Sequence, residues 1–467
     1  MKTFLKTFLL TAISLILIAV IALGSTYAIK PDLVKTWFGI EDTQTEEPTD
    51  DTENPDDGNI GDVEIPLPGG DDSEIEVPID PGDEEPEIKV LDFTFDGGTL
   101  TGYTGSETEI VIPSSYSIDS EGNFIEGDDY TVTAIADGDF DSGVFYNSSI
   151  TSVQFPSTLE RIGDYAFMLC NNLTSITLPS SVTELGNGSF SISNLETLEY
   201  EGTIEQWLSI DFDYWMDDNS HSFIVDGEEV TDLIIPEGIE TIGISAFTGC
   251  SGIESISFPS SLKTIFGNAF NSCTGLTSID LSDTSVDTID NNAFCCCENL
   301  STVVLPQYLV QINDSAFMGC TSLANISFPA SLQSIGYYAF SGCTSLTNID
   351  LSDCTYFGNL TNGVFQDCSS LTSVILPNSI YNISDTVFNN CENLQMIVIN
   401  AVEVPNLGDN AFLTCSEDLV IYVPAEAVES YKTAEGWSQY ADIIEAITEV
   451  SIGDEEIPGD DDIVEIE

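Results

Sequence analysis

Residues 162–185 read IGDYAFMLCNNLTSITLPSSVTEL, and units of this kind recur along much of the chain. Each unit is marked by a phenylalanine, and most copies carry a cysteine three residues later. The marker phenylalanines are Phe167, Phe190, Phe247, Phe270, Phe294, Phe317, Phe340, Phe365, Phe388 and Phe412. Their spacings are 23, 57, 23, 24, 23, 23, 25, 23 and 24 residues. A period of about 20 to 50 residues is typical of stacked repeats, so the sequence predicts a solenoid.

Each unit contains one predicted strand. In the quoted unit, Leu173, Ile176 and Leu178 form an L-x-x-I-x-L pattern, and Pro179 ends the strand because proline has no N–H to donate. Alternation along the strand places Ile176 and Leu178 in the core and Ser175 outward. Matching strands are predicted at residues 255–258, 278–281, 302–305, 325–328, 348–351, 373–376 and 396–399. Stacked units therefore form a parallel sheet, and each phenylalanine fills the core beneath a turn or short helix.

The spacing of 57 residues indicates one extra unit together with an insertion at about residues 201–231. The insertion carries Trp207, Trp215 and the only histidine of the chain, His221. Tryptophan combines a large apolar ring with one polar N–H group. We therefore expect these aromatic side chains to seal the inserted loop against the side of the solenoid.

The A-F-x-x-C-x-x-L-x-x-I-x-L-P unit at residues 166–179 and the stretch at 316–327 resemble the leucine-rich repeats of BspA-type bacterial surface proteins. So do VDGEEVTDLIIPEGIETIG (225–243), LTGYTGSETEIVIPS (100–114) and LVIYVPAEAVESYKTAEGW (419–437). The resemblance covers about residues 90–448. It implies a solenoid of leucine-rich repeats of about 23 residues, with a parallel β-sheet face and short helices or turns opposite. It also implies adhesion or host-protein binding, and a closing segment that caps the stack. We place the solenoid at residues 89–448 and its cap at about 419–448.

The charge of the chain is strongly one-sided. It has 8 Lys and Arg against 80 Asp and Glu, a formal net charge of -72. After Lys89, the cations are Arg161, Lys263 and Lys432. Nucleic acids and anionic lipid surfaces need clustered cations, so binding to either is not expected. The acidity itself fits a self-repelling soluble surface, a high-salt habitat or weak diffuse Ca²⁺ association.

Both ends of the chain differ from the repeats. Residues 1–29 are apolar after Lys2 and Lys6, and their length lies between that of a signal peptide and a membrane span. They predict an uncleaved N-terminal membrane anchor or, alternatively, a signal peptide cleaved near Ala28. Residues 30–88 predict an acidic, Pro/Gly-rich disordered stalk, and residues 449–467 an acidic tail. Either interpretation of the N-terminus exports the repeats, to the cell surface or as a secreted protein.

The cysteines do not indicate a disulfide framework. Nine stand three residues after a marker phenylalanine, but Ser193 and Ser148 take that position after Phe190 and Phe145. Serine in place of cysteine predicts a small buried slot, so we expect reduced thiols. One histidine and no C-x-x-C spacing argue against zinc, and no serine lies in a G-x-S-x-G turn. We expect no catalytic residue, no cofactor and no metal site.

The outward strand positions are the remaining candidate for function. They are mostly small and polar, and their apolar members gather toward the C-terminal half. Ordinary strand propensity at solvent positions is one explanation of this pattern, and a partner-binding patch is the other. The predicted partner-binding residues are Asn325, Asn348, Asp350, Val304, Ile375, Met396 and Val398.

These observations predict a non-catalytic leucine-rich-repeat protein of the cell surface. It is expected to bind an extracellular protein or glycan through the solenoid face and to contact the membrane only through its N-terminal segment. A structural surface-coat protein with Ca²⁺-mediated association is the alternative among non-enzymes. A cell-wall-acting enzyme is the alternative of a different class.

Overall fold

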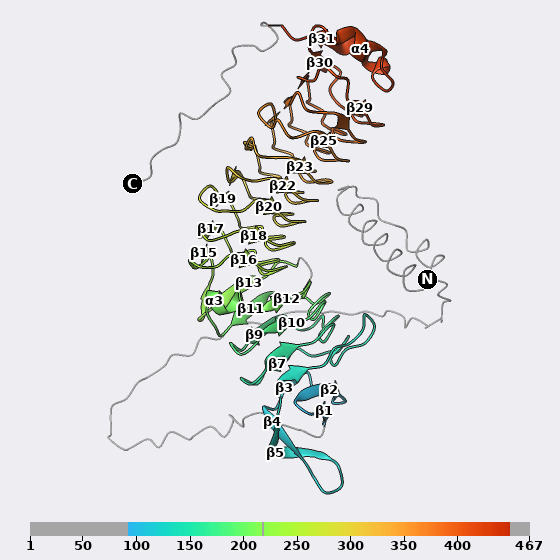
Figure 1. The fold of residues 1–467 in the computed structure, drawn as a ribbon. Helices are drawn as coiled ribbons and strands as arrows, with labels where there is room; N and C mark the ends of the chain where they lie inside the picture. The colour runs from blue at the N-terminus through green and yellow to red at the C-terminus, as the bar shows by residue number, and fades with distance from the viewer. Residues whose placement is uncertain (1–91, 217–218, 449–467) are drawn as a thin grey trace, which may run out of the picture. The chain divides into compact units, whose positions relative to one another are not determined.

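A computed structural model of the chain describes residues 92–216 and 219–448. These residues wind into a β-solenoid whose consecutive turns stack through parallel strands (Figure 1). The predicted anchor or signal peptide (1–29), the stalk (30–88) and the acidic tail (449–467) lie outside the described residues. The predicted solenoid architecture is confirmed, and three sides of each turn position the residues discussed below.

The first side is the predicted ladder of repeat strands. Neighbouring strands pair in register, so Ile176 lies beside Leu198 and Ile349 beside Val374. These apolar residues point into the core, and their sequence neighbours point outward. The strands are β3 (Glu109–Val111), β7 (Ser152–Gln154), β9 (Ser175–Leu178), β11 (Thr197–Tyr200), β13 (Ser222–Val225), β14 (Glu228–Glu229, antiparallel), β15 (Asp232–Ile234), β17 (Ser255–Ser257), β19 (Ser278–Asp280), β21 (Thr302–Val304), β24 (Asn348–Asp350), β26 (Ser373–Leu376), β28 (Met396–Ile399), β30 (Val420–Val423) and β31 (Ile444–Ala446).

The predicted strand at residues 325–328 is wrong. This segment lies between β21 and β24 in the chain but pairs with neither of them. The N–H of Thr347 still donates to the carbonyl oxygen of Ala324 at 3.0 Å. Within the described part of the chain, residues 325–328 donate no backbone hydrogen bond. The segment therefore separates from the neighbouring strands after Ala324, and the sheet divides here.

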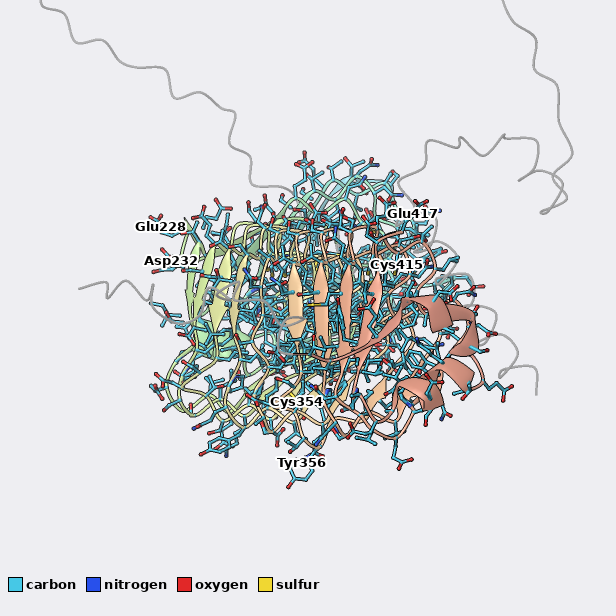
Figure 2. The ribbon with its side chains drawn as sticks, turned by 90° about the horizontal axis from the view of Figure 1, so that it is seen from above. Glu228, Asp232, Cys354, Tyr356, Cys415 and Glu417 are labelled. Atoms are coloured by element: carbon cyan, nitrogen blue, oxygen red, sulfur yellow. The ribbon has the colours of Figure 1, made fainter. Side chains whose placement is uncertain are left out.

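The second side is a ladder of short strands, most of them of two residues, that the sequence analysis did not predict. Most of the two-residue strands consist of a polar or charged residue and an apolar one, and the apolar members, such as Ile242, Ile265 and Ile289, point into the core. Its strands are β2 (Thr99–Tyr103), β6 (Ala134–Ile135), β8 (Arg161–Ile162), β10 (Glu184–Leu185), β12 (Asp211–Phe212), β16 (Thr241–Ile242), β18 (Thr264–Ile265), β20 (Thr288–Ile289), β22 (Gln311–Ile312), β23 (Ser334–Ile335), β25 (Asn359–Leu360), β27 (Asn382–Ile383) and β29 (Asn406–Leu407). Tyr356 projects from the turn that joins β24 to β25 (Figure 2). Unlike the first ladder, this one runs unbroken from β16 to β29.

The third side carries the marker phenylalanines on tight turns, not on short helices. Two residues before and two after each phenylalanine, the backbone is left-handed, as at Tyr165 (φ 54°) and Leu169 (φ 63°) around Phe167. Left-handed residues cannot continue a right-handed helix. They turn alternate N–H groups toward the next repeat, so the N–H of Phe167 donates to Ser189 O at 2.7 Å. The turn alternative of the prediction is therefore the one observed.

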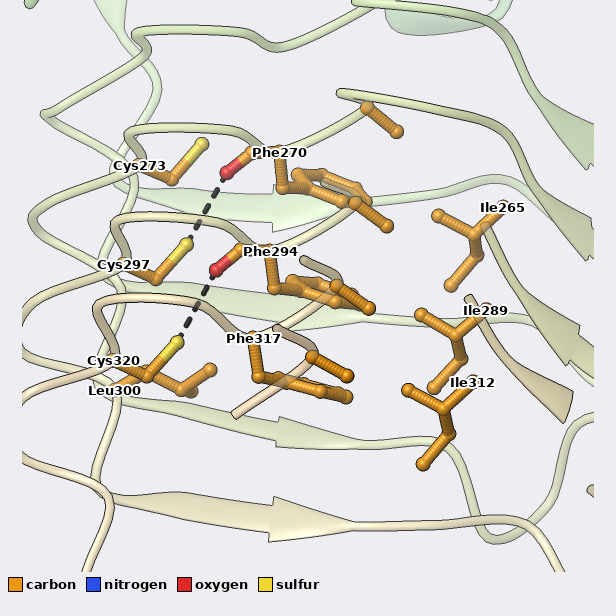
Figure 3. Packing of buried hydrophobic residues seen from close by; sticks show 14 of the residues in the cluster. Ile265, Phe270, Cys273, Ile289, Phe294, Cys297, Leu300, Ile312, Phe317 and Cys320 are labelled. Atoms are coloured by element: carbon orange, nitrogen blue, oxygen red, sulfur yellow. Dashed lines mark hydrogen bonds between the residues drawn. The ribbon is translucent and has the colours of Figure 1, made fainter. Parts of the chain in front are cut away.

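The core is a column of stacked rings. Phe270 lies 5.4 Å from both Phe247 and Phe294, in nearly parallel planes. On the second side, Ile265 and Ile289 form a parallel column (Figure 3). Offset stacking of aromatic rings adds to the stabilisation from apolar burial. One repeat therefore packs on the next through like residues.

The cysteines form a column beside the rings, and all twelve are free thiols. Eight of them donate a hydrogen bond to the carbonyl oxygen of the phenylalanine one turn earlier (Figure 3). They are Cys170, Cys273, Cys297, Cys320, Cys343, Cys368, Cys391 and Cys415. Ser193 occupies the same position and donates to Phe190 O at 2.6 Å. The expected packing of these side chains as buried groups is confirmed, apart from the half-buried Cys415.

The insertion fills one turn of the core with indoles, whereas the sequence predicted that they seal the loop against the side of the solenoid. Trp207, at the end of α3 (Ile204–Trp207), is fully buried, and its Nε1–H donates to Ala246 O at 2.9 Å. Trp215 is also buried and donates to Ser245 O at 3.0 Å. Phe190 packs edge-on against Trp215, with ring centroids 6.2 Å apart. The two indoles therefore fill the core of the turn that has no marker phenylalanine.

Other elements lie at the two ends of the described region. At its start, β1 (Phe93–Asp96) pairs with β2, and β4 (Ser115–Ile118) forms a hairpin with β5 (Phe124–Thr131). Near its end come α4 (Val428–Thr433) and the 3₁₀ helix η2 (Ser438–Ile443). The buried side chain of Trp437 donates to Pro405 O at 2.7 Å and lies 6.2 Å from the ring of Phe412. Aromatic side chains therefore close the last ring column.

Candidate binding face

The strand face is defined here as the outward positions of the first ladder from β19 to β30. Its register arranges the side chains in two columns. One column runs through Asn348, Ser373, Met396 and Val420. The other runs through Asp350, Ile375, Val398 and Tyr422. Hydrogen-bonded strands hold both columns, so their spacing is fixed by the backbone.

A polar pocket of about 390 Å³ opens where the sheet divides. It lies between residues 325–328 and β24 with its following turn, and three of the predicted residues line it together: Asn325, Asn348 and Asp350. Ser327 adds to its polar lining, as do Ser352 and Asp353, which the sequence analysis missed. The division of the strand ladder is thus the reason that a pocket exists on this face.

Hydrogen bonds fix the asparagines of this pocket. The hydroxyl of Thr347 donates to Asn325 Oδ1 at 3.2 Å and accepts from Asn348 Nδ2 at 3.1 Å. Asn348 Oδ1 in turn accepts from the hydroxyl of Ser373 at 2.6 Å. Asp350 accepts from the backbone N–H of Ser352 at 2.8 Å. These bonds orient the polar groups before a partner arrives, which lowers the entropic cost of binding.

The pocket lies in a strongly acidic region. Burial, followed by the charges of Asp353 and Asp350, raises the pKa of the adjacent Cys354 thiol to about 11. No lysine, arginine or histidine occurs between Lys263 and Lys432. The carboxylates of the pocket therefore have no cationic partner from this stretch of the chain.

The four predicted apolar residues do not form one exposed patch. Ile375 and Met396 are half-buried on adjacent strands that lead away from the pocket. Val398 exposes only 4%, because Ile375 and Tyr422 flank it on both sides in the outer column. Val304 is 40% exposed but lies on β21, across the division of the sheet.

The structure adds Tyr422 to the outer column, next to Val398. Its strand keeps the alternation of the other repeat strands and ends at Pro424, so its outward position could have been predicted from the sequence. Ser352 stands where neighbouring repeats carry Pro329 and Pro377 after the strand, but Ser282 stands at the same position in its own repeat and does not line the pocket. Loss of this proline therefore does not by itself predict the pocket.

The single histidine does not form a nucleophilic pair. His221 is 2% exposed, and its Nε2 lies 3.6 Å from the sulfur of Cys250. Burial lowers the pKa of His221 and raises the pKa of Cys250. Both groups are therefore neutral, whereas a catalytic cysteine needs a thiolate. The pair packs inside the solenoid next to the insertion.

Two further findings concern metals and membranes. Among residues 92–216 and 219–448, no group of three or more His, Cys, Asp or Glu side chains is arranged to hold a metal ion. Within the same ranges, the helices are too short or too polar to cross a bilayer. The predicted N-terminal anchor lies outside these ranges.

The repeats match a known family along most of the solenoid. The model of the BspA-type leucine-rich repeat region matches residues 139–214, 219–309 and 287–418, in six copies. The chain belongs to the BspA-type leucine-rich repeat family. This assignment confirms the resemblance seen in the sequence. No curated protein gives a significant match to this BspA-type chain.

Several solved structures are similar to this BspA-type chain. A leucine-rich cell surface protein from Faecalibacterium prausnitzii A2-165 is 24% identical, with a TM-score of 0.44, over 77% of this chain and 93% of that one. A leucine-rich repeat protein from Bacteroides ovatus is 22% identical, with a TM-score of 0.39, over 78% and 99%. The pneumococcal vaccine antigen PcpA is 17% identical, with a TM-score of 0.45, over 78% and 98%.

Proposed function

We propose that this chain is a non-catalytic recognition protein displayed outside the cell, which binds an extracellular protein through the strand face. The observation that carries the proposal is the polar pocket of Asn325, Asn348 and Asp350 at the start of the two columns. A polar site beside partly exposed apolar side chains resembles the rim and core of protein interfaces. The apolar N-terminal segment, residues 1–29, supports export.

The charge of this region indicates which kind of protein binds. Asp350 and Asp353 face the pocket, and the sequence supplies no cation between Lys263 and Lys432. A partner with lysine or arginine at its surface compensates these carboxylates, whereas an acidic partner is repelled. Ile375, Met396 and Tyr422 then make the apolar contacts of the interface. We therefore expect the partner to present a basic rim around an apolar centre.

Site-directed photocross-linking tests this proposal. The full chain carries benzoylphenylalanine at Met396, on the strand face, or at Tyr308, which is 66% exposed in the turn after β21. We expect a specific cross-linked protein from Met396 only, with a yield that decreases at high salt because the contact includes exposed charges. Equal products from both positions would reject the strand face. Loss of the product after glycosidase treatment would assign the recognised group to a glycan instead.

A further inference from the structure

A second hollow lies on the turn side of the solenoid, away from the strand face. Its volume is about 640 Å³, within the usual range of about 300 to 1,000 Å³ for ligand pockets. Its walls come from the turns around Phe167, Phe190, Phe247 and Phe270, together with residues of the insertion. We call this hollow the insertion pocket.

The insertion pocket exists because one turn of the solenoid is irregular. The N–H groups of Gly188 and Phe190 donate to the carbonyl oxygens of Tyr214 and Trp215, so the insertion supplies the next backbone rung. Trp215 then reaches the following turn through its side chain, by its hydrogen bond to Ser245 O. Other repeats have a marker phenylalanine on a complete turn at this point, whereas here the indole of Trp215 continues the core. The outer surface beside Trp215 is left hollow.

Aromatic and apolar side chains form part of the lining. Tyr214 is 48% exposed and Phe140 is 55% exposed. The ring of Tyr165 lies against Gly188, where any side chain would collide with it. Met168 and Met216 are buried and belong to the same lining. Rings that remain partly exposed in a hollow provide flat apolar surfaces for a ligand.

Amide side chains supply the polar groups. The pocket is lined by six asparagines: Asn171, Asn187, Asn194, Asn219, Asn268 and Asn271. Asn194 and Asn219 donate Nδ2 bonds to backbone carbonyls, which hold them in place. Within the described residues, no hydrogen bond occupies the side-chain amides of Asn187 and Asn268. Each amide offers two donors and an acceptor, which suits a ligand that has hydroxyl groups.

The described part of the lining carries no charge. Among residues 92–216 and 219–448, those that line the pocket include no Asp, Glu, Lys or Arg, although the chain has 80 acidic residues. The net charge of -72 repels anionic ligands from the surface around it. These features together select a neutral ligand with both apolar and hydroxyl surfaces.

We propose that the insertion pocket binds a neutral oligosaccharide. The C–H faces of a sugar ring pack on Tyr214 and Phe140, and its hydroxyls bond to Asn187 and Asn268. This site is separate from the strand face, and the inference does not depend on the protein partner proposed there.

Calorimetric titration of the full chain tests the inference. The neutral probes are cellohexaose, xylohexaose, mannohexaose and maltohexaose, and the anionic probes are sialyllactose and an oligogalacturonate. We expect at least one neutral probe to bind, with affinity reduced by about tenfold or more in Tyr214→Ala and in Asn187→Asp. Asn187→Asp keeps the side-chain shape but removes two donors and adds a charge. Tyr356→Ala is the matched control, because Tyr356 is 76% exposed and is not one of the residues that line the pocket.

Three results would overturn the inference: no binding of any neutral probe, equal or tighter binding of the anionic probes, or unchanged affinity in both pocket variants. Thermal unfolding of each variant checks that the fold is retained. If Tyr214→Ala is unstable, Asn187→Asp alone decides the result. Asp350→Lys, a strand-face variant, is expected to bind the oligosaccharide normally, so failure of one site is distinguishable from failure of the other.

Discussion

The thiol of Cys297 donates a hydrogen bond to the carbonyl oxygen of Phe270 one turn earlier, with sulfur and oxygen 3.2 Å apart. The same relationship joins Cys320 to Phe294 and Cys343 to Phe317. The cysteine column therefore links successive turns through hydrogen bonds and packing, without covalent bonds. Serine at position 193 is also buried, but its hydroxyl donates to Phe190 O of its own turn, so that position lacks the hydrogen bond to the preceding turn.

Substitution of Cys297 tests the contribution of this bond. Cys297→Ser keeps a donor, whereas Cys297→Ala removes it and leaves a small cavity. We expect Cys297→Ala to lower the free energy of unfolding by about 1 kcal/mol more than Cys297→Ser does. Urea denaturation under reducing conditions measures both values. Equal stability of the two variants would show that the hydrogen bond contributes nothing.

The buried thiols also predict a dependence of stability on pH. Burial raises the pKa of Cys343 from the ordinary 9.0 to about 12, and it raises those of Cys273, Cys297 and Cys320 as well. In the unfolded chain these thiols ionise near pH 9, but in the folded chain they stay protonated. Their contribution is therefore complete below pH 9 and is lost as the pH rises from 9 toward 12. Each such thiol changes the unfolding free energy by about 1.4 kcal/mol per pH unit in that interval.

Urea midpoints measured at pH 7, 8 and 10.5 in the presence of reductant check this dependence. We expect little change from pH 7 to 8 and a marked decrease at pH 10.5. A midpoint that is the same at pH 8 and 10.5 would mean that the thiols do not remain protonated in the folded protein.

A glycine and a tyrosine provide a test of the turn geometry. Gly363 is left-handed (φ 64°), and a methyl group there would overlap the ring of Tyr338. Gly227 is also left-handed (φ 76°) but has open space around the added methyl. Gly363→Ala should therefore lose about 1 to 3 kcal/mol more stability than Gly227→Ala. Adding Tyr338→Ala should recover part of the difference, and thermal unfolding of the double variant measures this recovery.

Trp207 is expected to be the most sensitive residue of the insertion. Trp207→Phe removes the indole hydrogen bond to Ala246 O and leaves a cavity in the ring column. We expect a loss of about 2 to 4 kcal/mol in the free energy of unfolding. Tyr214→Phe, at an exposed neighbouring position, should change it by less than about 0.5 kcal/mol. Similar losses in both variants would contradict the role of the indole as a substitute for the missing phenylalanine.

The repeat strands and the core were predictable, because their pattern is repeated many times. Ile176 and Leu178 are buried, as alternation requires, and the marker phenylalanines stack. The second ladder was not predicted, because strands as short as Thr264–Ile265 have too few residues to show alternation. The turn conformation was left open, because left-handed backbone occurs at residues as different as Tyr165, Leu169 and Asn268.

The candidate site was predicted only in part. Asn325, Asn348 and Asp350 were placed on the outward face, and the structure brings them into one pocket. The division of the sheet that forms this pocket depends on hydrogen bonds that residues 325–328 fail to make, and the strand pattern there looks ordinary. Val398 is buried because Ile375 and Tyr422 flank it in the outer column, and the sequence analysis did not include Tyr422. The insertion pocket depends on a path of the insertion that only the structure shows.

The most direct test of strand-face recognition compares two matched charge reversals, Asp350→Lys and Asp280→Lys. Both aspartates occupy the same outward strand position, and both accept a hydrogen bond from the N–H two residues later. Only Asp350 lines the polar pocket. The affinity of the full chain for the protein cross-linked at Met396 should decrease by about tenfold or more in Asp350→Lys and change little in Asp280→Lys. Equal affinities of the two variants would contradict recognition at this pocket.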